Sequence, residues 1–228
     1  LLAKSKITLS KKAETDRSRI VDFSNHSYHR IFSQNSFTLH GRFYGPWWQS
    51  LKSDERKHIK INGESVVELD YGSLHVHLAY SKLGIDYGHD NDPYSIDGFD
   101  KGDRDIIKLA TLTSLNMRNA KYFSQTMTKR LQEDGLYRKN IPFKAIKEGI
   151  ITKHHKIKEY FFSGIGLEFM YLDSKVTEYI MKKFTTQKIP VLSIHDSYIV
   201  GKSYKSLLVE IMTSAFKHHK LPSLPIIK

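Results

Sequence analysis

Two aspartates each follow a short run of apolar residues, and paired carboxylates are ligands for divalent cations. Asp196 lies in a His-Asp-Ser turn between the runs 191–194 and 198–200, which are too short for helices and predict a hairpin. Asp70 ends a second apolar run, 66–70. An Asp in a turn is usually simple turn chemistry, so neither residue is informative alone. Two strands that each bring one carboxylate to the same sheet edge, however, can hold a pair of divalent cations.

The composition favours a polyanionic partner. The chain has 228 residues, enough for one large domain or two smaller ones, and many aromatic residues, which argue against disorder. It carries 36 Lys and Arg against 24 Asp and Glu, a net charge of +12 that exceeds what solubility requires. Nucleic acid is therefore the first candidate partner, and an anionic membrane surface the second.

The chain contains no Cys, which excludes disulfides and cysteine-based zinc sites and fits a reducing intracellular compartment such as the cytoplasm. No apolar run is long enough to cross a membrane and no signal peptide is visible, so we expect a soluble protein that does not act in a membrane. The chain begins with Leu1 rather than Met, and we expect further sequence upstream of it.

The elements that must position the two aspartates form a small antiparallel sheet with helices alongside, which is an α+β fold. Residues 58–61 and 66–70 predict two strands joined by a turn at 62–65. Trp47 and Trp48 are expected in the core. Helices are predicted at 16–32, 73–83, 104–116, 122–133, 142–162 with a break near Gly149, 167–186 and 204–218, with a further helix start at 53–56.

Two basic stretches suit phosphate groups. Arg104 and Lys108 are four residues apart on one face of a predicted helix, so both side chains can meet one triphosphate. A solvated basic face is the simpler alternative for this pair. In the stretch 38–45, Gly41 permits a close backbone approach and Arg42 suits a phosphate.

Together these stretches resemble the palm and fingers of family A DNA polymerases and of phage-type single-subunit RNA polymerases. Residues 38–42 (Thr-Leu-His-Gly-Arg) resemble the T/DxxGR motif that contacts the template–primer hybrid, and 70–74 resemble motif A. Residues 104–108 resemble the start of motif B in the fingers helix, and 195–197 resemble motif C. Each motif is weak alone, but the four occur in the family's order.

The resemblance implies a compact, reduced right-hand polymerase fold in four parts. These are a basic N-terminal segment at 1–36, a first part of the palm at 37–102, fingers-like helices at 103–166 and a second part of the palm at 167–228. The implied activity is template-directed transfer of nucleotides from nucleoside triphosphates to a primer 3′-hydroxyl by two-metal phosphoryl transfer. The implied partners are a nucleic acid template, a primer and nucleoside triphosphates.

The resemblance also implies a role for individual residues. Asp70, Asp196 and the carbonyl of Tyr71 would hold two Mg²⁺ or Mn²⁺ ions, and Tyr71 also lies at the substrate. Arg104 and Lys108 would hold the triphosphate, and Lys108 could protonate the leaving group. The remaining assignments are Arg42, Thr38, Gly41 and His195 at the nucleic acid, and His75 and Asn116 at the sugar of the incoming nucleotide.

Several departures from the family leave the choice of sugar open. Asn116 stands where the family usually has a Tyr, and His75 stands where the DNA polymerases have a Glu that blocks a ribose 2′-hydroxyl. Motif C is His-Asp-Ser, as in the RNA polymerases, and the spacings between motifs are short. Two other functions stay open: a template-independent terminal transferase, for which the missing Tyr leaves room, and a catalytically inactive nucleic-acid-binding module, against which both aspartates argue.

Three histidine pairs invite a metal-site interpretation. They are His75 with His77, His154 with His155, and His218 with His219. Adjacent side chains diverge on a helix, and no third ligand follows at a suitable spacing. We therefore predict that these histidines are surface residues or phosphate contacts.

Overall fold

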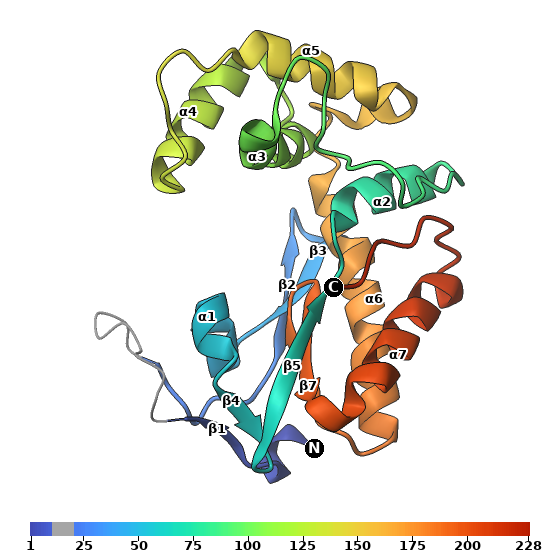
Figure 1. The fold of residues 1–228 in the computed structure, drawn as a ribbon. Helices are drawn as coiled ribbons and strands as arrows, with labels where there is room; N and C mark the ends of the chain where they lie inside the picture. The colour runs from blue at the N-terminus through green and yellow to red at the C-terminus, as the bar shows by residue number, and fades with distance from the viewer. Residues whose placement is uncertain (11–20) are drawn as a thin grey trace.

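The computed structural model describes residues 1–10 and 21–228 and contains a five-stranded antiparallel sheet (Figure 1). The strand order is β1 (Ile7–Leu9), β4 (Ile59–Ile61), β5 (Glu64–Asp70), β7 (Ser197–Gly201) and β6 (Leu192–Ile194). Helices lie beside this sheet, so the predicted α+β class is confirmed. The predicted strands at 58–61 and 66–70 and the predicted hairpin around Asp196 are all present.

Strand β7 is buried along its whole length, and its neighbour β5 is partly buried on both faces. Antiparallel pairing places Leu69 opposite Tyr198 on one face, where both join the main hydrophobic core. On the other face, Val66 and Ile199 join a smaller core with Trp47 and Trp48, which are buried as predicted. Because an apolar core lies on each side of the sheet, consecutive apolar residues such as Val66 and Val67 point into different cores.

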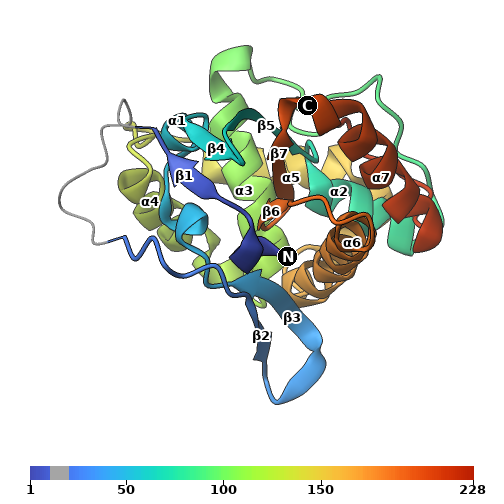
Figure 2. The same cartoon turned by 90° about the horizontal axis from the view of Figure 1, so that it is seen from below.

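A second, two-stranded sheet and two long helices flank the first sheet. The strands β2 (His29–Ser33) and β3 (Ser36–Tyr44) form a hairpin that extends from the body of the molecule (Figure 2). Helix α6 (Gly166–Thr186) packs against β3 and against α7 (Lys205–His218), and α7 packs on β5 and β7. Helix α6 therefore connects the β2–β3 hairpin to the helical side of the main sheet.

The remaining helices gather near one end of the sheet (Figure 1). Helix α2 (Leu74–Lys82) follows β5 directly, and α3 (Arg104–Asn116) packs against α4 (Phe123–Glu133) and α5 (Phe143–Lys153). The short helices are α1 (Ser53–Arg56), η1 (Leu2–Lys4), η2 (Trp47–Ser50), η3 (Lys101–Asp103), η4 (Ala120–Tyr122), η5 (His155–Tyr160) and η6 (Lys202–Tyr204).

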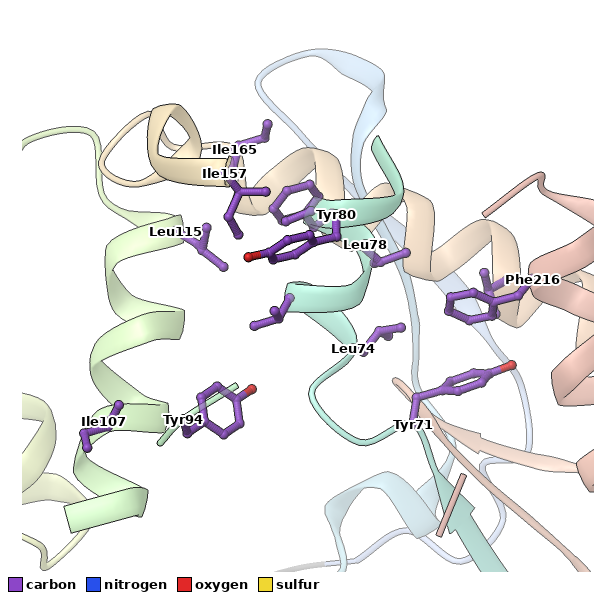
Figure 3. Packing of buried hydrophobic residues seen from close by; sticks show 14 of the residues in the cluster. Tyr71, Leu74, Leu78, Tyr80, Tyr94, Ile107, Leu115, Ile157, Ile165 and Phe216 are labelled. Atoms are coloured by element: carbon purple, nitrogen blue, oxygen red, sulfur yellow. The ribbon is translucent and has the colours of Figure 1, made fainter. Parts of the chain in front are cut away.

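One hydrophobic cluster connects the end of β5 to these helices (Figure 3). Tyr71, just after β5, lies near Phe216 of α7, with the ring centroids 5.1 Å apart. Leu74 and Leu78 of α2 belong to the same cluster, as does Ile107 of α3. The strand end that carries Asp70 and the helix that carries the basic pair therefore share one packed core, which fixes their relative positions.

Two helix predictions need correction. Of the predicted helix at 16–32, residues 11–20 lie outside the described part of the chain, residues 21–28 form no helix, and 29–33 form strand β2. Pairing with β3 overrides the weak local helical pattern there. Helix α5 continues through Gly149 and ends at Lys153. A Cβ at position 149 would lie 2.8 Å from the side chain of Ile96, so this glycine permits close packing instead of breaking the helix.

The prediction that the paired histidines are surface residues or phosphate contacts is wrong for His77 and His154, and a surface position is wrong for His75 as well. His75, His77 and His154 are buried, with exposed fractions of 8%, 4% and 0%. His154 Nε2 lies 2.8 Å from the carbonyl of Pro93, and His77 Nδ1 lies 2.9 Å from Ser223 Oγ. Burial lowers the pKa of His154 and of His77 to about 4, so both are neutral near pH 7.

None of the helices within residues 1–10 and 21–228 has the length and apolar character to span a bilayer.

Candidate active site

The paired ends of β5 and β7 bring Asp70 and Asp196 together. Asp70 is the last residue of β5 and lies opposite Ser197, the first residue of β7. The backbone N–H of Tyr71 donates to the carbonyl of Asp196 at 3.3 Å. Both aspartates border the same cavity, of about 230 Å³. The sheet edge predicted from the two apolar runs is thus formed by neighbouring strands.

The turn that carries Asp196 has only two residues, because β6 ends at Ile194 and β7 begins at Ser197. His195 has a φ of 56°, in the left-handed region that such tight turns require and that His tolerates better than most residues. Its carbonyl accepts from Thr177 Oγ1 of α6 at 3.2 Å. Helix α6 therefore holds the turn in place.

The ring of His195 packs among other aromatic side chains. Its centroid lies 5.1 Å from that of Tyr44, which in turn stacks on His40 at 5.8 Å. Burial, with the nearby positive charge of Arg42, lowers the pKa of His195 to about 4. His195 is therefore a neutral donor or acceptor near pH 7, not a cation.

Two cavities meet at the aspartates. The smaller one is bordered on the helical side by Arg104 and Lys108. A larger one, of about 950 Å³, lies beside Arg56 and His195. Asp70 and Asp196 border both cavities. A ligand in either cavity could therefore reach the two carboxylates.

The basic pair of α3, Arg104 and Lys108, borders the smaller cavity. Arg104 is held by Asp92, with Nε 2.6 Å from Oδ2 and Nη2 3.1 Å from Oδ1, and its guanidinium lies over the ring of Tyr94. Lys108 is exposed and makes no ion pair with any carboxylate of the described residues. Arg104 is thus fixed in place, while the Lys108 ammonium is available to a ligand.

Arg42 reaches the same cavity from β3 and is held by a residue that sequence reasoning missed. Its Nε donates to Oδ2 of Asp173 in α6 at 2.6 Å, and its Nη2 lies 3.3 Å from His75 Nε2. Asp173 is completely buried, and its Oδ1 has no hydrogen-bond partner among residues 1–10 and 21–228. Burial raises the pKa of Asp173 to about 6, against the opposing effect of Arg42. Burial and Arg42 lower the pKa of His75 to about 3, so His75 is neutral.

A signal for Asp173 was present in the sequence. Phe169, Val176 and Ile180 are all buried and lie on one face of α6 at helical spacing, with Asp173 among them. A carboxylate inside an apolar stripe requires a partner, because an unpaired buried charge is very costly. The sequence could not show that this partner is Arg42.

Three predicted residues, Asn116, Thr38 and Gly41, border neither of the two cavities. Asn116, at the end of α3, donates from Nδ2 to the carbonyl of Leu112 at 2.7 Å, and it is not among the residues that border the cavity. Thr38 is exposed on the hairpin. Gly41 is buried with a φ of 72°, and a Cβ there would lie 3.0 Å from Ser174 Oγ of α6. Gly41 therefore permits the hairpin to approach α6 closely.

The carboxylates of Asp70 and Asp196 are a donor set that fits a Mg²⁺ site in which the substrate supplies further ligands. No group of three or more His, Cys, Asp or Glu side chains is arranged to hold a metal within the described residues. Mg²⁺ is commonly held by one or two carboxylates, with substrate phosphates and water completing its shell. Burial raises the pKa of Asp70, and Asp196 raises it further while Lys228 opposes the shift. A bound dication would relieve this repulsion between the carboxylates, so the pair fits the implied ions.

Tyr71 can contribute only its backbone to this site. Its side chain is 1% exposed, and its hydroxyl donates to the carbonyl of Met212 in α7 at 2.7 Å. The residue nevertheless borders the small cavity. The prediction that its carbonyl is a ligand is compatible with this arrangement.

Comparison with known proteins finds a distant structural likeness. No protein-family model matches the sequence, and no curated protein matches it. Among solved structures, the chain is similar to the POL domain of Pol1 from M. smegmatis, in complex with DNA primer-template and dNTP, with a TM-score of 0.43 and 10% sequence identity. The match covers 88% of this chain and 46% of that one, so this chain spans less than half of that chain's length. The likeness concerns the fold alone.

Proposed function

We propose that this protein is a template-directed nucleotidyltransferase that extends the 3′-hydroxyl of a primer. The observation that carries the proposal is that Asp70 and Asp196 border both cavities. The smaller cavity, with its basic helix face, takes the nucleoside triphosphate. The larger one takes the primer end on its template. The attacking hydroxyl and the reacting phosphate then meet beside the two carboxylates.

Asp70 and Asp196, with the carbonyl of Tyr71, are the groups that would hold two Mg²⁺ or Mn²⁺ ions. When bound, these ions supply the charge neutralisation and the acidified primer hydroxyl on which in-line phosphoryl transfer depends. The two carboxylates occupy fixed positions because paired strands and the tight turn at His195 hold their backbones. This rigidity supports the proposal, since positioning is most of what phosphoryl transfer requires of a protein.

The basic residues of α3 act on the triphosphate. Lys108 binds it and donates a proton to the departing pyrophosphate. Arg104, held by Asp92, binds the same group from one turn earlier on the helix. In this proposal, residues 103–166 serve as the fingers, and 37–102 and 167–228 form the two parts of the palm.

The residues around Arg42 act on the nucleic acid and the sugar. Arg42 is oriented by Asp173, and with His195 it contacts phosphates of the primer or template. The backbone at Gly41 and the exposed Thr38 contact the template–primer hybrid along the hairpin. His75 lies beside Arg42 at the small cavity and faces the sugar of the incoming nucleotide. Asn116 is a more distant candidate for the sugar pocket.

Primer extension with a labelled primer tests the proposal. The reaction is run with and without a template strand, with ribo- and deoxyribonucleoside triphosphates, and with Mg²⁺, Mn²⁺ or EDTA. We expect extension that requires a template and a divalent ion and that is lost in Asp70→Asn and in Asp196→Asn. The matched control is Asp134→Asn, which changes an exposed Asp after α4 and should extend primers normally.

The other outcomes are equally informative. Extension without a template would replace the proposal with a terminal transferase. Tight nucleic-acid binding without any extension would indicate an inactive binding module. Near-normal extension by either Asn variant would reject the assignment of the two carboxylates.

A further inference from the structure

The last residues of the chain add a short strand segment beside the end of β5. Tyr71 and Ile227 form an antiparallel bridge. The N–H of Asp70 donates to the carbonyl of Lys228 at 2.9 Å, and the N–H of Lys228 donates to the carbonyl of Asp70 at 3.2 Å. The N–H of Gly72 donates to the carbonyl of Ile226 at 2.8 Å. Figure 1 shows this end of the chain beside the end of β5.

This segment is anchored at its other end by buried contacts. Ser223 is completely buried; its Oγ accepts from the N–H of Tyr87 at 2.9 Å and lies 2.9 Å from His77 Nδ1. Leu224 and Ile227 pack against the main hydrophobic core. The segment is therefore fixed both before and at Lys228, and its backbone determines where the lysine side chain begins.

Lys228 borders the same small cavity as Lys108 and the two aspartates. Among the cationic residues that border this cavity, Arg42 is paired with Asp173 and Arg104 with Asp92. Lys108 and Lys228 make no ion pair with a carboxylate within the described residues, although the charge of Lys228 acts on Asp70. Two ammonium groups from different elements thus border one cavity beside the candidate metal ligands.

We propose that Lys228 binds the polyphosphate of the incoming nucleotide, together with Lys108. This inference rests on the proposed function and adds a residue that none of the polymerase-like motifs includes. Lysine is a common phosphate ligand because its compact charge can meet any phosphate oxygen. Lys228 is exposed, so phosphate binding does not require an existing buried pair to break. The alternative is that Lys228 only neutralises Asp70 until a metal ion binds.

Calorimetric titration of the whole protein with inorganic triphosphate, in EDTA, tests the inference. We expect Lys228→Ala to weaken binding by about 10-fold or more, as for the loss of one charge-assisted contact. Lys228→Arg should keep most of the affinity. The matched control is Lys217→Ala, which removes an exposed lysine of α7 outside the cavity and should stay within about 2-fold of the unmodified protein.

A parallel titration with Mn²⁺ distinguishes phosphate binding by Lys228 from the alternative that Lys228 only neutralises Asp70. If Lys228 is only a counter-ion of Asp70, Lys228→Ala will bind Mn²⁺ more tightly and bind triphosphate as before, which overturns the inference. Unchanged affinity for both ligands, or no triphosphate binding by the unmodified protein, overturns it as well. The backbone hydrogen bonds do not depend on the lysine side chain, and Lys228→Met provides a second variant if the Ala variant is poorly folded.

Failure of this inference can be told from failure of the proposed function. If the unmodified protein binds triphosphate through Lys228 but does not extend primers, the polymerase assignment fails and the assignment of the phosphate site stands. If the unmodified protein extends primers, and Lys228→Ala keeps the same KM for nucleotide and the same triphosphate affinity, the inference fails and the polymerase assignment stands.

Discussion

Nε of Arg42 donates to Oδ2 of Asp173 at 2.6 Å, although 131 positions separate the two residues. Asp173 is completely buried, and the Arg42 side chain is 15% exposed. The pair joins the β2–β3 hairpin to α6 directly beside the candidate metal ligands. Stability and site geometry therefore depend on the same contact.

Removal of the Asp173 carboxylate should destabilise the protein strongly. Asp173→Ala leaves a largely buried guanidinium without its partner, and breaking a buried pair in this way costs about 3–5 kcal/mol. Urea unfolding at pH 7.5 measures the loss. Glu159→Ala is the control, because that side chain is 87% exposed and should change stability by less than about 0.5 kcal/mol. A loss of similar size in both variants would show that Asp173 and Arg42 contribute no more than a surface pair.

The pH dependence of stability should change in Asp173→Asn. Burial raises the pKa of Asp173 from 3.8 to about 6, so between these values the native state binds a proton that the unfolded chain has released. Asp173 therefore favours folding at low pH, and this contribution is lost as the pH rises from about 4 to about 6. We expect the stability of the unmodified protein, relative to Asp173→Asn, to fall by at most about 1.4 kcal/mol per pH unit in this window and then to level off. Urea midpoints from pH 4 to 7.5 provide the measurement; a difference that stays constant, or that grows with pH, would contradict the expectation.

If the protein extends primers, Lys108→Ala should show which step this lysine serves. Loss of a charge-assisted contact costs about 1.5–3 kcal/mol, which is about 10- to 150-fold in KM for the nucleotide. Loss of the proton donor should lower kcat by about 10²- to 10⁴-fold even at saturating nucleotide. Steady-state incorporation separates the two effects. Lys129→Ala is the control, since that side chain is 79% exposed on α4; equal kinetics for both variants would remove Lys108 from the site.

Binding to duplex nucleic acid should depend strongly on salt and little on base sequence. Each phosphate contact adds about −0.9 to the slope of log K against log salt, so about three contacts weaken binding about 40-fold for a fourfold rise in salt. Lys57 borders the larger cavity, and Lys57→Ala should reduce the slope by about 0.9. Fluorescence anisotropy with several unrelated duplexes measures both quantities. A slope near zero would argue against a nucleic-acid partner despite the net charge of +12.

The sequence by itself determined the local elements that carry the candidate chemistry. The apolar run before Asp70 and the paired runs around Asp196 predicted strands, because these runs are rich in β-branched residues and too short for helices. The spacing of Arg104 and Lys108 predicted a shared helix face, since residues four apart lie one turn from each other. These patterns extend over fewer than about ten residues, and the physical rules that govern them are local.

Only the tertiary structure decided which distant residues join this site. Asp173 reaches Arg42 and Lys228 reaches the backbone of Asp70 through packing between separate elements. The burial of His75 and His154, and the strand in place of a helix at 29–33, follow from packing in the same way. Such contacts depend on how complete faces fit together, and side-chain periodicity within one element carries no information about the partner on another.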